Sequence, residues 1–159
     1  MIKLMQLIIG ALFLTTGTLG FADDGKNIVG VWRLVSFETE LQATGAREHT
    51  RGKNATGFLI FTPDGRMMAV LTDEGRTPPK TEQDRAGLFN SMVAYTGTYR
   101  IEGDRWVTKV DVAWNPALLG SEQPRSFRFE GNRLQEITPW RNVTPDKVGR
   151  GVIVWQRAN

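Results

Sequence analysis

The stretch that decides the fold is GVWRLVSFE, residues 30–38. Its side chains alternate between two faces, and the alternation places Trp32, Leu34 and Ser36 on the same face. A period of two residues predicts a half-buried β-strand. The glycine ahead of Trp32 lets the chain turn sharply at the head of that strand. Trp32 is therefore either an ordinary core residue or the residue that seals one end of a closed barrel.

Three predicted hairpins follow the first strand. The segment TGFLIFTPDGRMMAVLT, residues 56–72, has apolar runs at 57–61 and 66–72 around a Thr-Pro-Asp-Gly turn. The second hairpin pairs residues 95–102 with 105–114, and the third turns at Gly131-Asn132. A last strand is expected in GVIVWQR, residues 151–157.

The intervening segments predict loops and one short helix. Residues 39–55, 73–80 and 141–150 are polar or rich in glycine and proline, which is typical of loops. Thr81 is a suitable N-cap, and apolar residues near helical spacing continue from Ala86 to Val93.

The element count predicts an all-β protein. Eight strands joined mostly as neighbouring hairpins, with one short helix and no internal repeat, leave a sandwich or an up-and-down barrel. We favour an eight-stranded antiparallel up-and-down barrel, because closing the sheet removes its exposed edges.

The N-terminal segment, residues 1–22, has the pattern of a secretory signal peptide. Lys3 precedes an apolar run, and small residues end at Ala22. A membrane anchor is the alternative, but polar residues and Gly10 break the run before it is long enough to span a bilayer. We therefore expect a single barrel domain over residues 23–159, located in the periplasm or secreted, with no stable membrane span after cleavage.

The composition argues against several classes of function. A net charge of +3, from basic residues scattered along the chain, is too small to indicate nucleic-acid binding. The chain has no cysteine and a single histidine, His49, so we expect no disulfide, no metal site and no cofactor. A nucleophile elbow and a glycine-rich phosphate loop are both absent from the sequence.

The two ends of the predicted barrel carry a resemblance to a known family. Gly30-x-Trp32 opens the first strand and Arg157 ends the last, so the guanidinium can cover the indole ring. This pairing resembles the lipocalin signature. The segments GVWRLVSFE, GFLIFTPDGRMMAVL, YTGTYRIEGD, NPALLGSEQPRSF and VWQR resemble, in order, those of the small bacterial and fungal lipocalin-like domain family. The resemblance covers about residues 28–157 and implies an eight-stranded barrel, with Gly30, Trp32 and Arg157 closing it.

The predicted ligand site lies inside the barrel. If Trp32 points inward, the same alternation places aromatic side chains and one arginine toward the interior of later strands. Gln123 is added because it stands in the family-like segment NPALLGSEQPR. The candidate ligand-binding residues are Tyr95, Tyr99, Trp114, Gln123, Arg125 and Phe127. Such a lining suits an apolar molecule with an acidic or carbonyl group.

Three functions remain open at this level. The leading hypothesis is an exported barrel that binds a small hydrophobic or amphipathic molecule without catalysis. The second is a cofactor-free cyclase or isomerase in the same cavity, with Arg125 or Tyr99 polarising a carbonyl and Glu122 acting as base. The third is a filled barrel that contacts a protein through residues 39–55. The sequence indicates no oligomeric state.

Overall fold

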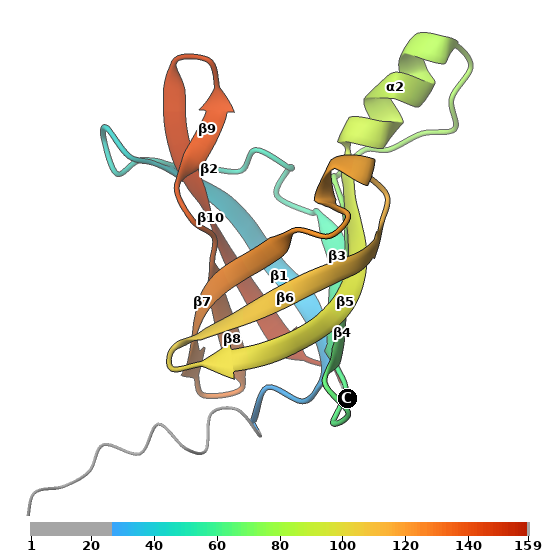
Figure 1. The fold of residues 1–159 in the computed structure, drawn as a ribbon. Coiled ribbons are helices and arrows are strands. Elements are labelled where there is room, and N and C mark those ends of the chain that lie inside the picture. Colours follow the sequence, from blue (N-terminus) through green and yellow to red (C-terminus); the bar gives the residue numbers. More distant parts are fainter. Residues whose placement is uncertain (1–26, 159) are drawn as a thin grey trace, which may run out of the picture.

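The computed structural model describes residues 27–158 and shows a closed antiparallel β-barrel (Figure 1). The sheet order is β2-β1-β3-β4-β5-β6-β7-β8-β10-β9, and pairing between β1 and β10 closes it. Eight strands form the barrel, which confirms the predicted fold: β1 (Gly30–Leu41), β3 (Thr56–Phe61), β4 (Arg66–Thr72), β5 (Met92–Glu102), β6 (Arg105–Ala113), β7 (Glu122–Glu130), β8 (Arg133–Ile137) and β10 (Lys147–Arg157). The predicted signal peptide, residues 1–22, lies outside the described residues.

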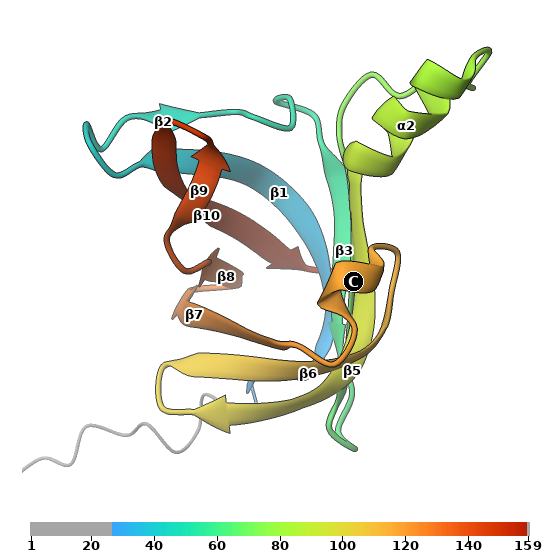
Figure 2. The same ribbon diagram turned by 45° about the horizontal axis from the view of Figure 1, so that its top comes forward.

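The two ends of the barrel differ. Tight turns join β3 to β4, β5 to β6 and β7 to β8 at one end, where both termini of the barrel domain also lie (Figure 1). Gly65 in the first of these turns has a φ of 87°, a conformation that glycine adopts without strain. Longer connections surround the other end, so that end forms the mouth (Figure 2).

Two segments predicted as loops contain short strands at the mouth. β1 continues to Leu41, beyond the predicted end, and its last part pairs with β2 (Arg47–Glu48). β9 (Arg141–Thr144) pairs with the early part of β10, which starts at Lys147 instead of the predicted residue 151. Polar composition misled the prediction here, because β2 and β9 are exposed along their whole length and lack a buried apolar face.

The predicted helix is present but shorter. α2 (Glu82–Asn90) has Thr81 as its N-cap, and the Thr81 side chain accepts from the Asp84 amide in a capping box. No residue of α2 is buried, and the helix leans away from the mouth (Figure 2). Met92 and Val93, predicted as helical, begin β5 instead. A 3₁₀ turn, η1 (Pro116–Leu118), follows β6 on the same side of the mouth.

Two β-bulges correct the predicted inward faces. The register of β1 against β10 shifts between Leu34 and Ser36, so Phe37 is buried and Ser36 is not. The register of β5 against β6 shifts after Thr96, and Val112, which strict alternation from the buried Trp106 would point inward, is 61% exposed. One extra residue in a strand reverses the direction of every side chain that follows it.

The half of the barrel next to the tight turns is filled by aromatic side chains. Their ring centroids lie 4.9–5.9 Å apart in a continuous series. The series is Tyr99, Phe61, Trp106, Phe127, Phe129 and Trp32. Space for a ligand must therefore lie toward the mouth.

Over residues 27–158, no helix has the length and hydropathy needed to cross a membrane.

Candidate functional site

A cavity of about 290 Å³ occupies the half of the barrel nearest the mouth. We call it the inner cavity. Its apolar wall comes from inward-facing residues of four strands: Phe37, Ala69, Leu71, Val93, Ile153 and Trp155. Phe89, Trp114 and Leu118 stand at its rim. This volume lies at the small end of the range usual for ligand sites in proteins.

A buried ion pair stands in the wall of the inner cavity. Arg125 on β7 donates from Nε to Oε1 of Glu136 on β8 over 3.1 Å; the Glu136 side chain is buried, and the Arg125 side chain is 12% exposed. The second carboxylate oxygen of Glu136 accepts from Trp155 Nε1 at 2.8 Å. Arg125 also donates to the Gln123 side chain and to the Pro124 carbonyl. The hydrogen-bonding groups of this pair are therefore largely occupied by the protein itself.

Burial shifts the pKa of two groups at this place, Glu136 of the pair and the nearby Tyr95. Desolvation raises the pKa of Glu136, although Arg125 and Trp155 act in the opposite direction. Desolvation likewise raises the pKa of Tyr95, which keeps its phenol protonated at neutral pH. The cavity thus contains a neutral phenol next to a carboxyl group whose ionisation is disfavoured by burial.

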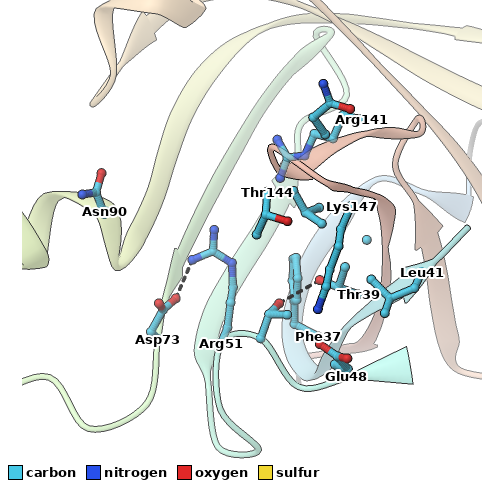
Figure 3. A pocket seen from close by; sticks show the side chains of 14 residues that line it. Phe37, Thr39, Leu41, Glu48, Arg51, Asp73, Asn90, Arg141, Thr144 and Lys147 are labelled. Atoms are coloured by element: carbon cyan, nitrogen blue, oxygen red, sulfur yellow. Dashed lines mark hydrogen bonds and ion pairs between the residues drawn. The ribbon is translucent and has the colours of Figure 1, made fainter. Parts of the chain in front are cut away.

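A second, more open space of about 440 Å³ lies outside the first (Figure 3). We call it the outer hollow. It runs between the late part of β1, the segment around β2 and the β9–β10 hairpin. Phe37, Arg51, Asn90 and Arg141 line both spaces, so the outer hollow leads directly into the inner cavity.

Two arginines stand where the two spaces meet. Arg51 is in an ion pair with Asp73, and its guanidinium lies 5.1 Å from the centre of the Phe37 ring. Arg141 on β9 extends toward the same space as Arg51 (Figure 3). Within residues 27–158, Arg141 has no ion-pair or hydrogen-bond partner for its side chain. Partial desolvation, and then the charges of Arg125 and Arg51, lower the pKa of Arg141.

The structure brings four of the six predicted ligand-binding residues together. Tyr95, Trp114, Gln123 and Arg125 all line the inner cavity. Tyr99 and Phe127 lie in the aromatic filling below it. The Tyr99 hydroxyl donates to the Thr62 carbonyl at 3.2 Å, in the turn between β3 and β4.

The predicted closing residues meet at the opposite end. The Arg157 guanidinium lies 4.3 Å from the centre of the Trp32 ring and donates to the Val29 carbonyl at 2.9 Å. Trp32 donates from Nε1 to the Ile28 carbonyl at 2.8 Å. Gly30 has a φ of 138°, and a Cβ there would collide with Arg157. The glycine therefore lets the arginine cover the indole, far from the mouth.

The prediction missed several lining residues, and one of them could have been found. Glu136 has the same parity as Leu134 in β8, so a charged residue stood at an inward position of the predicted strand. Glu122, considered earlier as a possible base, points outward and pairs with Arg100 at 2.9 Å. Arg51 and Arg141 lie in segments predicted as loops, where alternation carries no signal.

Over the described part of the chain, histidine and carboxylate side chains do not gather into a group of three that could hold a metal ion. The chemistry that the cavity itself offers comes from Tyr95, Arg125 and Glu136, which can donate hydrogen bonds or exchange a proton.

Comparison with known proteins identifies one family. A family model described as a lipocalin-like domain matches residues 29–158, nearly the whole of the described barrel. A search of curated proteins finds no match to the chain.

Proposed function

Because the chain belongs to the lipocalin-like domain family, we propose that it binds one small hydrophobic or amphipathic molecule inside its barrel. The signal-peptide pattern of residues 1–22 supports the further proposal that binding takes place in the periplasm or outside the cell. Binding without chemical conversion is the function that the site supports best.

The observation that carries this proposal is the contrast between the two halves of the barrel. Aromatic side chains fill one half, whereas about 290 Å³ stays open in the other half behind an apolar wall. Open apolar space in a protein interior weakens packing, so it needs a compensating role. The same contrast disfavours a barrel that is filled throughout and acts only as a protein contact.

The first experiment is native mass spectrometry of the protein purified gently from its own host, followed by denaturing extraction of any bound molecule. We expect a stoichiometric small apolar compound. A mass with nothing bound, together with no thermal shift across a panel of lipids and metabolites, would contradict the proposal and leave a protein partner as the object of search.

A matched pair of substitutions tests the place of binding. Ala69 faces the inner cavity, whereas Ala94 on the neighbouring strand faces the outside of the barrel. Ala69→Leu fills part of the cavity and should weaken binding of the extracted compound at least fivefold. Ala94→Leu adds the same atoms outside and should leave affinity unchanged. Equal affinities for both variants would place the ligand elsewhere.

Acid–base isomerisation of the bound molecule is the second candidate function. Glu136, with its raised pKa, and the Tyr95 phenol both line the inner cavity, and proton transfer needs groups of this kind. The extracted compound would be incubated with the protein in deuterium oxide. This reaction would be established if deuterium enters a C–H position of the compound with wild-type protein and does not enter it with Glu136→Gln. Recovery of the compound without deuterium supports binding alone.

A further inference from the structure

We propose that the ligand is a single-tailed amphipathic anion, whose negative group is held by Arg141 while its apolar tail enters the inner cavity. This inference rests on the proposed function and adds the chemical class of the ligand to it. It also moves charge recognition away from Arg125, the residue that the sequence singles out.

The argument starts from the charges that line the two connected spaces. Four cationic side chains and three carboxylates line them. Arg125 is paired with Glu136, and Arg51 is paired with Asp73. An anion that bound at either arginine would have to compete with a carboxylate already in contact.

The remaining charged groups of the lining are Glu48, Arg141 and Lys147. Lys147 extends toward Glu48 in the outer hollow, and neither residue lines the inner cavity (Figure 3). Within residues 27–158, neither Lys147 nor Arg141 forms an ion pair, so the outer hollow holds two cations without a carboxylate in contact. Arg141 is the one of these two that also lines the inner cavity.

The surroundings of Arg141 favour an anion there. Its side chain is accessible to solvent, and the positive charges of Arg125 and Arg51 disfavour a further positive charge there. A carboxylate between Arg141 and the cavity would offset this repulsion, because a planar guanidinium can hold a carboxylate through two parallel hydrogen bonds. The Thr144 side chain lies beside this place in the outer hollow.

The position of Arg141 also sets the shape of the ligand. Arg141 stands where the two spaces join, with the apolar wall of Leu71, Ile153 and Trp155 below it. A molecule bound there must enter tail first and leave its charge at the mouth, since a buried charge without a partner is costly. The inner cavity has room for one short tail and not for a large ring system.

Isothermal titration with decanoate and decanol tests this assignment, with both ligands kept below the concentrations at which they form micelles or separate. They share one tail, but only decanoate is charged. We expect wild-type protein to bind decanoate about tenfold more tightly than decanol at low salt, and less selectively at high salt. Arg141→Gln should abolish this preference by weakening decanoate binding, whereas Arg141→Lys should keep part of it.

Arg33→Gln is the matched control. Arg33 is exposed on the outer face of β1, and its substitution removes the same charge as Arg141→Gln. It should retain the preference for decanoate. Equal binding of both ligands by wild type, or an unchanged preference in Arg141→Gln, overturns the Arg141 assignment but leaves the proposed function in place. Failure of either ligand to bind, combined with no small molecule extracted from the native protein, overturns both.

Discussion

Arg125 on β7 and Glu136 on β8 are diagonal neighbours in the sheet, because Glu136 is paired with Phe127, and a 3.1 Å hydrogen bond joins them inside the barrel. Because of this contact, the arginine that the sequence singled out for a ligand already has a partner within the protein. Trp155 completes the arrangement by donating to the second carboxylate oxygen. The same wall of the cavity therefore contains a contact between two strands and the residues of the proposed ligand site.

Breaking this pair should destabilise the barrel. Arg125→Leu and Glu136→Leu each leave a buried charged group without its partner, and each should lower the free energy of unfolding by about 3–5 kcal/mol. The double variant should lose much less than the sum of the two. Urea denaturation of all four proteins measures this coupling, and strictly additive losses would show that the two residues do not interact.

Glu136 should also leave a signature in the pH dependence of stability. Burial raises its pKa in the folded protein above the unfolded value, so its contribution is fully present below the ordinary glutamate pKa. That contribution is lost as the pH rises through the raised pKa. The free energy of unfolding of wild type, relative to Glu136→Gln, should therefore fall between acid and neutral pH.

The difference in unfolding free energy between wild type and Glu136→Gln removes the contribution of the other carboxyl groups to the pH dependence. Arginine neighbours lower the pKa of Glu102 and Glu122, and these groups favour the folded state as the pH rises. They are the same in both proteins. A difference that stays flat or increases with pH would contradict the raised pKa of Glu136.

Trp32 should matter for stability and not for ligand binding. Trp32→Ala removes a buried indole from the filled half of the barrel and should cost roughly 3–5 kcal/mol of unfolding free energy. Ligand affinity, measured per folded molecule, should not change. Val31→Ala, on the outer face of the same strand, serves as the control; a change of ligand specificity in Trp32→Ala would place that indole at the binding site.

The bulge in β6 makes a prediction about two valines. Val110 is buried and Val112 is 61% exposed, although strict alternation would put both on the same face. Val110→Lys should destabilise the protein by more than about 3 kcal/mol, because it buries an unpaired charge. Val112→Lys should stay within about 0.5 kcal/mol of wild type. Thermal unfolding separates the two cases, and similar losses in both variants would argue against the bulge.

Much of the architecture was predictable because it depends on neighbours along the chain. Alternation marks strands, and the turn at Thr62 to Gly65 needs residues of set conformation at adjacent positions. The faces beyond each bulge were not predictable. A bulge exists only through hydrogen bonds to a partner strand, so it leaves no mark in the local pattern.

The sequence by itself determined the eight strands and their order, because periodicity marks the strands and turn residues mark the hairpins. It also determined the closing contact of Trp32 with Arg157, because these residues lie in the first and last strands, which are neighbours in a closed barrel. Only the tertiary structure decided which arginine is available to a ligand. Charge compensation depends on contacts between strands, and these pair Arg125 with Glu136 and leave Arg141 at the mouth. Cavity volume was decided in the same way, because it depends on how side chains from distant strands fill a shared space.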